Sequence, residues 1–466
     1  YKDVNYQFIK ISQKLHRRKI LMNKLDSFFR LKDNGTDVKT EIIAGITTFF
    51  TMAYIIFVNP DILSDAGMDF NSVMVATCIA GAIGSILTGI MSNYPFAQAP
   101  GMGLNAFFAY SVVLGLGYTW QQALAAVFIS GIIFIFITMS GIRTAVVESI
   151  PMFLKNAISV GIGLFIAFIG FSNAGIIVGG ESPILDFGNF ASPEVLLAII
   201  GLIITAILMI RNVKGALFIG IIATTIIGIP MGVTNLNIDL TGSSITLKDT
   251  FMQMDFKGLL IREGGFFTSF ISVITVILAF FIVDMFDTLG TLIGTANKAG
   301  FLDEKGNLPK GNQAMMADAI ATCAGAVLGT STVTTFVESS AGVSEGGRTG
   351  LTAIVVGILF LLAIFLAPVA GIIPSAATAP ALIIVGVLMM SAVKNIDFED
   401  LDEAIPAFFT IALMPFSYSI ANGIAAGFIF YSIVKIVRGK AKEVHPIMYV
   451  FVGLFLLRFV LLTLFT

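Results

Sequence analysis

Charged residues are scarce in this sequence. Asp, Glu, Lys and Arg make up 12% of the 466 residues, whereas 56% of the residues are hydrophobic. A water-soluble fold of this length could not hide so much apolar surface, because much of any folded surface must face water. The net charge is only −2, and no basic patch of the kind that binds nucleic acid is present. The composition therefore excludes a soluble protein and gives no support for a nucleic-acid partner.

Histidine and cysteine are also rare. His16 and His445 lie outside the apolar runs, which excludes a histidine metal site or histidine proton relay within the membrane. Cys78 and Cys323 each lie inside an apolar run and are better explained as small buried residues than as a disulfide. Neither a His-Glu-x-x-His metal motif nor a Gly-x-Ser-x-Gly nucleophile motif is present, so nothing supports an enzyme.

The sequence contains instead a series of apolar runs, many of them close to the length that crosses a bilayer as a helix. They number about fourteen, which predicts an all-α polytopic membrane protein. A further run, 446–466, is either a fifteenth crossing or a helix lying at the membrane surface. The fourteen runs are 41–59, 72–91, 97–116, 122–141, 155–178, 193–210, 215–231, 266–296, 313–329, 331–345, 350–369, 375–393, 404–416 and 418–437.

The charges of the loops fix a predicted orientation. The segment before the first run is rich in Lys and Arg, which predicts a cytoplasmic N-terminus. Counting alternate sides from there, Arg211, Arg348 and Lys394 all fall inside, whereas the outside loops are almost free of Lys and Arg. The one exception is the long outer segment 232–265, which carries three cations.

The two halves of the chain resemble each other. Three pairs of segments match in the same order, and both cysteines occupy the matching position in the first pair. With seven spans in each half, an odd number, the halves must insert with opposite orientations, which is the architecture of secondary transporters. The pairs are Val75–Ser85 with Ile320–Thr330, Gln98–Asn105 with Gly329–Glu338, and Ile150–Pro151 with Ile373–Pro374.

Spans 3 and 10 are interrupted by residues that disfavour helix. Residues 97–103 hold a proline and two glycines, and residues 330–335 are mostly small hydroxyl and β-branched residues. Extended backbone at membrane depth is tolerated only where protein or a cavity surrounds it. We therefore expect short extended stretches in spans 3 and 10 that face each other at the centre of two inverted seven-span repeats.

Four polar residues are the candidate site: Asn105, Asp284, Asp287 and Glu338. Asp284 and Asp287 lie inside the apolar run 266–296, three residues apart and so on one helical face. A charge at this depth costs several kcal/mol, so a functional role is the first hypothesis. Asn105 and Glu338 follow the two interrupted segments, where half-helices of inverted-repeat transporters approach the substrate.

Each candidate also has a simpler explanation. Asn105 could cap the half-helix that follows the interruption, and Glu338 could complement a helix dipole. Asp284 could be an interhelical hydrogen-bond anchor, and Asp287 could be structural or a proton site. Carboxyl and amide groups favour a substrate rich in N–H donors. An inorganic anion would be repelled, because these segments contain no Lys or Arg.

Four motifs resemble the AzgA-like purine permeases of the nucleobase–cation symporter-2 (nucleobase:ascorbate) family. The resemblance runs from about residue 24 to the C-terminus and implies proton-coupled import of hypoxanthine, guanine or adenine across the plasma membrane. It also implies alternating access, no cofactor other than the coupling proton, and often a homodimer in the lipid bilayer. A sulfate-type anion carrier of the same architecture is the alternative. The motifs are Lys39–Pro60, Ala99–Phe108, Val283–Thr291 and Thr335–Val343.

The resemblance also assigns roles and domains. Asn105, Asp284 and Glu338 match purine-binding positions, whereas Asp287 matches an acidic position important for transport, so Asp287 and Glu338 are the proton-coupling candidates. The resemblance implies a core domain that moves against a gate domain. These domains follow a predicted cytoplasmic segment, 1–38, whose first 21 residues are interpreted as an upstream extension. The predicted core is 39–141 and 266–373, and the predicted gate is 142–265 and 374–466, including the C-terminal hydrophobic segment.

Overall fold

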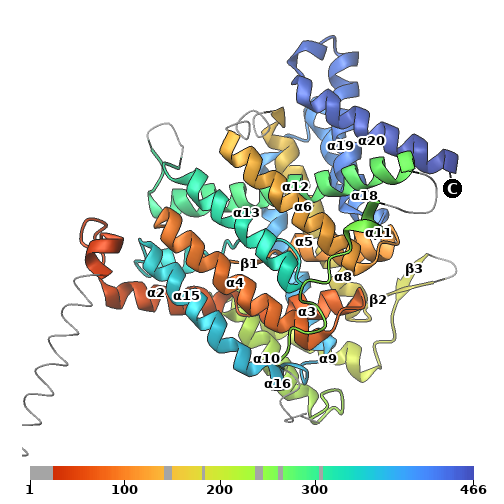
Figure 1. Ribbon diagram of the computed structural model, residues 1–466. Coiled ribbons are helices and arrows are strands. Elements are labelled where there is room, and N and C mark those ends of the chain that lie inside the picture. Colours follow the sequence, from red (N-terminus) through yellow and green to blue (C-terminus); the bar gives the residue numbers. More distant parts are fainter. Residues whose placement is uncertain are drawn as a thin grey trace, which may run out of the picture.

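The computed structural model describes residues 25–140, 149–180, 184–236, 245–260, 266–303 and 308–465. The predicted extension, 1–21, lies outside these residues. Within the described residues the chain is helical apart from two short two-stranded sheets (Figure 1). Eight of the described helical segments are long and apolar enough to cross a membrane, and shorter apolar helices account for other predicted runs. The predicted all-α polytopic fold is therefore confirmed.

The first half of the chain contains the helices of the first seven predicted spans. Span 1 differs from the prediction of one run, because it consists of two helices that meet at Ala53 and Tyr54. The elements are α2 (Val38–Met52), α3 (Ile55–Asp65), α4 (Phe70–Ser92), β1 (Gln98–Pro100), α5 (Met102–Ala106), the π-helix η1 (Phe107–Gly115), α6 (Trp120–Ser140), α8 (Met152–Asn173), β2 (Ile177–Gly179), β3 (Leu185–Phe187), α9 (Pro193–Ile210) and α10 (Ala216–Gly228).

The second half repeats this order after one short helix. Its elements are α11 (Phe256–Leu260), α12 (Phe266–Ala299), α13 (Gly311–Leu328), β4 (Val333–Thr335), α14 (Ser339–Ser344), α15 (Gly350–Ala363), the 3-10 helix η2 (Ile364–Leu366), α16 (Ala367–Ala370), α17 (Ser375–Met389), the 3-10 helix η3 (Met390–Asn395), α18 (Leu401–Phe416), α19 (Ile420–Val437), the 3-10 helix η4 (Ala441–Glu443) and α20 (Pro446–Phe465).

Local sequence accounts for where several helices begin and end. Asp37 and Asp69 cap α2 and α4 by accepting the Thr40 and Ser72 amides at 2.9 and 2.8 Å, the bonds expected of N-cap carboxylates. Gly329 ends α13 with φ +95, a left-handed conformation that suits glycine. This stop releases the chain into the extended stretch that follows.

The two interrupted segments pair with each other in the middle of the molecule. Strands β1 and β4 are antiparallel, with Gln98 opposite Thr335 and Pro100 opposite Val333. The pairing is extended on either side by bonds from Gly101 N to Thr332 O and from Phe336 N to Ala97 O, both 3.0 Å. All six strand residues are buried, so the ladder satisfies backbone groups that no water could reach. The predicted extended stretches facing each other are confirmed.

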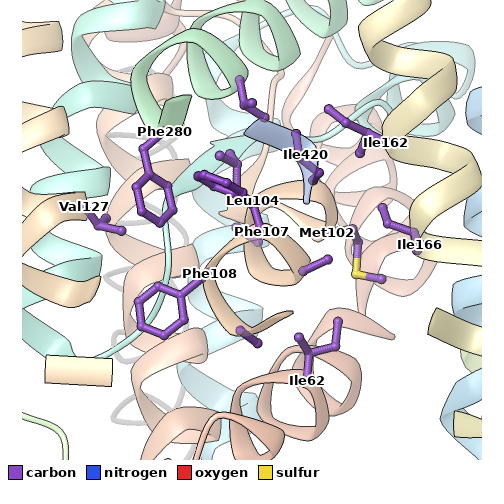
Figure 2. Packing of buried hydrophobic residues seen from close by; sticks show 14 of the residues in the cluster. Ile62, Met102, Leu104, Phe107, Phe108, Val127, Ile162, Ile166, Phe280 and Ile420 are labelled. Atoms are coloured by element: carbon purple, nitrogen blue, oxygen red, sulfur yellow. The ribbon is translucent and has the colours of Figure 1, made fainter. Parts of the chain in front are cut away.

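Helix α5 and η1, which follow β1, pack at the centre of the main hydrophobic core (Figure 2). Phe107 and Phe108 lie against Phe280 of α12, with ring centroids 4.7 and 6.5 Å from it. On the other side, Met102 faces Ile162 and Ile166 of α8 (Figure 2). This segment therefore joins the elements of span 8 to those of span 5.

One part of the predicted gate contacts the predicted core instead. Within the predicted outer segment, the Thr250 hydroxyl donates to Leu328 O at 3.0 Å and Met252 N donates to Val327 O at 2.8 Å, both at the end of α13. Asp255 N donates to Gln121 O of α6 at 3.1 Å. Residues 245–260 therefore contact helices of the predicted core through hydrogen bonds that join segments far apart in the sequence.

The last hydrophobic run forms one helix, α20, which lies beside α19 at the C-terminal end of the fold (Figure 1). The Phe428 ring of α19 lies 5.9 and 6.2 Å from the rings of Phe451 and Phe455. Farther along α20, Arg458 donates to the Asn422 side chain at 3.4 Å. These contacts pair the two helices antiparallel, so α20 packs against the rest of the fold.

Candidate functional site

Helix α12 brings two carboxyl groups to the paired strands. Asp284 is fully buried, as the prediction of an inward-facing helix face requires, and its Oδ2 accepts the Thr322 hydroxyl of α13 at 3.4 Å. Its Oδ1 has no hydrogen-bond partner among the described residues. The bond to Thr322 is what an interhelical hydrogen-bond anchor would make. The Oδ1 atom of Asp284 can still accept a hydrogen bond from another group.

Asp287 lies one turn further along the same face and is partly exposed. Its Oδ2 is 3.5 Å from the point that a Cβ on Gly101 would occupy, at the junction of β1 and α5. The carboxyl group of Asp287 therefore reaches the point where the first interrupted segment turns into helix. Solvent reaches part of this residue, in contrast to Asp284.

Glu338 comes to the same place from the opposite interrupted segment. It is partly exposed, occupies the position before α14, and makes no side-chain bond to the helix that follows. Its Oε1 instead accepts the hydroxyl of Tyr54 at 2.8 Å. Asp287 reaches the end of β1 and Glu338 follows β4, so the pairing of these strands brings the two predicted residues to the same region.

Asn105 lies inside α5 rather than at its start. The N-cap of α5 is Gly101, so the alternative that Asn105 caps this half-helix is wrong. Asn105 is fully buried, its amide donates to Pro100 O at 3.4 Å, and its carbonyl oxygen accepts the Ser331 hydroxyl. In this conformation it links the two interrupted segments, and protein groups occupy its hydrogen-bonding atoms.

Asp318 of α13 is a fifth polar residue of the site that the sequence reasoning missed. It is fully buried, and its Oδ1 accepts the Thr288 hydroxyl at 2.8 Å and the Gln98 amide at 3.4 Å. The Thr288 hydroxyl also lies 2.6 Å from that of Thr334 on β4. A carboxyl inside the apolar run 313–329 is the same signal that identified Asp284 and would have found it.

The four carboxyl groups form a connected electrostatic cluster. Asp284 interacts with Asp318 and with Asp287, and Asp287 interacts with Glu338. Like charges this close in a low-dielectric interior repel one another, so the cluster cannot carry all four charges at once. Within the described part of the chain, no group of His, Cys, Asp and Glu side chains has the geometry to hold a metal ion. The arrangement therefore suits proton exchange and the binding of N–H donors.

Comparison with known proteins identifies the family. The sequence model of the Permease family matches residues 39–426. A permease of Methanocaldococcus jannaschii is 51% identical over 444 residues, which cover 95% of this chain and 100% of that protein. Adenine permease AdeP of Escherichia coli is 45% identical and the alignment covers 94% of this chain and 96% of AdeP. Guanine/hypoxanthine permease PbuO of Bacillus subtilis is 46% identical, with 93% and 100% covered.

Solved structures share the fold at low sequence identity. The transmembrane domain of the cyanobacterial bicarbonate transporter BicA has a TM-score of 0.59 at 15% identity and covers 83% of this chain and 96% of that chain. SLC26A9 has a TM-score of 0.59 at 12% identity, with 86% of this chain and 66% of that chain covered. This likeness confirms the inverted-repeat fold. The family match and the permease relatives both span most of the chain. The protein is therefore a multi-pass membrane transporter and not an enzyme, and it belongs to the nucleobase–cation symporter-2 group of the Permease family.

Proposed function

We propose that this protein imports purine nucleobases together with protons across the plasma membrane. The observation that carries the proposal is the pair of partly exposed carboxyls, Asp287 and Glu338, that lie together where the two interrupted segments meet. Purine bases offer several N–H donors to such acceptors. The adenine and guanine/hypoxanthine permeases among the relatives support the same substrate class.

In the proposed site, a purine N–H edge contacts Glu338, and Asp284 and Asn105 complete the binding surface. The full burial of Asp284 and Asn105 in this conformation means that a purine would reach Glu338 and Asp287 first. Contact with the two buried residues then requires the β1–α5 segment to shift. A proton on Glu338 or Asp287 lowers the repulsion within the carboxyl cluster, which is why loading with proton and purine would favour movement of the site.

Movement in this proposal is alternating access between a core and a gate. Close helix contacts support the division: Gly89 lies against Gly350 O across α4 and α15, and Gly163 lies against Gly386 across α8 and α17. The first pair lies within the proposed core and the second within the proposed gate, which is 142–236 and 374–466 once residues 245–260 are assigned to the core. The N-terminus is cytoplasmic in this proposal, as the loop charges indicate. No cofactor is needed, and two copies form the homodimer that the family resemblance implies.

An anion carrier is the competing function, because BicA and SLC26A9 share the fold. The site disfavours it: four carboxyl groups surround the paired strands, and the described hydrogen bonds and ion pairs bring no Lys or Arg side chain to any of them. An inorganic anion would meet repulsion here without a compensating cation.

Uptake measurements test the proposal directly. We expect bacterial cells that lack their own purine permeases to take up labelled hypoxanthine, guanine or adenine when they express this chain, and to lose that uptake when a protonophore is added. Unlabelled purine bases should compete and uracil should not. Absence of purine uptake from well-expressed protein, together with sulfate or bicarbonate uptake, would transfer the function to the anion-carrier alternative.

A further inference from the structure

Tyr54 joins the first span to the acidic residue of the tenth. It stands at the junction of α2 and α3, is 2% exposed, and its hydroxyl donates to Oε1 of Glu338 at 2.8 Å. We propose that Tyr54 is a positioning residue of the purine site: its hydroxyl holds one carboxyl oxygen of Glu338 so that the other is presented to the substrate. The inference rests on the proposed purine transport and deepens it.

The backbone around Tyr54 fixes the position of its ring. Its carbonyl oxygen accepts the amides of Phe57 and Val58 at 3.1 and 3.0 Å, and the preceding Ala53 carbonyl accepts the Ile56 amide at 3.2 Å. The junction between α2 and α3 is therefore a hydrogen-bonded turn, and the buried ring leaves little freedom for the phenol. A fixed donor of this kind can orient a more mobile partner.

Glu338 is held by fewer bonds from its own segment. The helix that follows it has only six residues, and Glu338 makes no side-chain capping bond to that helix. Its carboxyl group accepts the Tyr54 hydroxyl from another segment of the chain and also lies beside its own backbone N–H. Hydrogen bonds to an ionised carboxylate are shorter and stronger than neutral ones, so this contact selects one side-chain orientation.

The two oxygens of the Glu338 carboxyl group have different roles in this proposal. Oε1 is occupied by the phenol, whereas Oε2 remains able to accept an N–H group of a purine. Loss of the hydroxyl would free Glu338 to turn toward other conformations, and purine affinity would fall while the helices stay packed.

The test is the variant Tyr54→Phe, which keeps the ring and removes only the hydroxyl. We expect the KM for hypoxanthine uptake to rise about tenfold, the effect of losing one hydrogen bond to a charged group, with Vmax per molecule of transporter within about twofold of the unchanged protein. The matched control is Tyr94→Phe, because the Tyr94 hydroxyl accepts the Lys310 amide at 3.3 Å and touches no carboxyl group.

Three results would overturn the proposal. The first is a KM of Tyr54→Phe within twofold of the unchanged protein, and the second is an equal rise in Tyr94→Phe. The third is failure of Tyr54→Phe to accumulate in the membrane, which would assign the hydroxyl to folding. A failure of the proposed function is distinguishable from these, because the unchanged protein itself would then show no purine uptake.

Discussion

The hydroxyl of Thr378 on α17 donates to Oδ2 of Asp61 on α3 at 2.5 Å. The Ser375 hydroxyl, one turn earlier on α17, donates to the other oxygen of the same carboxylate at 2.9 Å. These bonds join the proposed gate to the proposed core at the end that loop charges place outside. One carboxylate therefore holds two hydroxyls from the opposite domain.

A second set of bonds lies beside the first. The Tyr110 hydroxyl of η1 donates to Asp65 Oδ2 at 2.6 Å and accepts the side-chain amide of Asn173 from α8 at 3.2 Å. Together with Asp61, these groups close the outer seam between α3 and η1 on one side and α8 and α17 on the other. Under the proposed alternating access, this seam must open each time the site faces outward.

The outer seam gives the first prediction. Asp61→Asn replaces a charged acceptor by a neutral amide, so the bonds from Ser375 and Thr378 weaken and the outward-open state becomes more populated. The reporter is Ala381→Cys, a residue 1% exposed that lies one turn beyond Thr378, in a background without Cys78 and Cys323. We expect a membrane-impermeant maleimide added outside to label it at least about threefold faster, given the strength of bonds to charged acceptors.

The matched control for this prediction is Asp249→Asn. Asp249 is an aspartate of the outer loop that accepts the Ser72 hydroxyl at 3.4 Å, a contact within the core. This control should leave labelling unchanged. Equal labelling in Asp61→Asn and in the unchanged protein would show that the seam does not limit opening.

The two partly exposed acids should have separable roles. Glu338→Ala removes the acceptor held by Tyr54 and should abolish purine binding, whereas Asp287→Ala should spare binding more than transport because its expected role is to carry the proton. Isothermal titration of purified protein with hypoxanthine measures binding, and cell uptake measures transport. Equal loss of binding in both variants would contradict this division.

Asp318 should matter for stability through its acceptor bonds. Asp318→Ala removes one acceptor from the Thr288 hydroxyl and one from the Gln98 amide in a fully buried site, and leaves these groups only the hydroxyls of Thr334 and Thr335. A lost hydrogen bond to a carboxylate costs about 1.5–3 kcal/mol, so the variant should lose several degrees of apparent Tm in detergent. Asp318→Asn retains an acceptor oxygen and should lose less. A loss as large in Asp318→Asn would show that its charge, and not its hydrogen bonds, stabilises the site.

The sequence predicts the architecture because lipid imposes strong rules on it. Apolar runs of membrane length, loop charges and matching segments each follow from the cost of burying polar groups, and they led to the inverted-repeat fold. The same cost identified Asp284 and Asp287. Asp318 carried the signal as well, but it lies near the start of a short run, where a carboxylate is easily interpreted as interfacial.

Contacts between distant residues could not be predicted in this way. Tyr54 and Glu338 are 284 positions apart, and nothing in the pattern of span 1 marks one aromatic residue among 42 phenylalanines and 9 tyrosines. The role of Asn105 depends on where α5 begins. The helix begins at Met102 with Gly101 as its N-cap, because β1 ends at Pro100. The attachment of residues 245–260 to the core likewise rests on tertiary hydrogen bonds alone.

Gly103 gives the last prediction, at the contact between α5 and α8. A Cβ on Gly103 would lie 2.7 Å from Cγ2 of Ile162, closer than real side-chain contacts allow. Gly103→Ala should therefore lower uptake at least tenfold, because α5 can no longer pass close to α8, and Ile162→Ala added to it should restore most of the activity by removing the clashing atom. Gly290→Ala is the matched control, since a Cβ there meets no atom within 4 Å. If Ile162→Ala fails to rescue Gly103→Ala while both proteins accumulate normally, the glycine is needed for something other than this close approach, such as the backbone of the purine site itself.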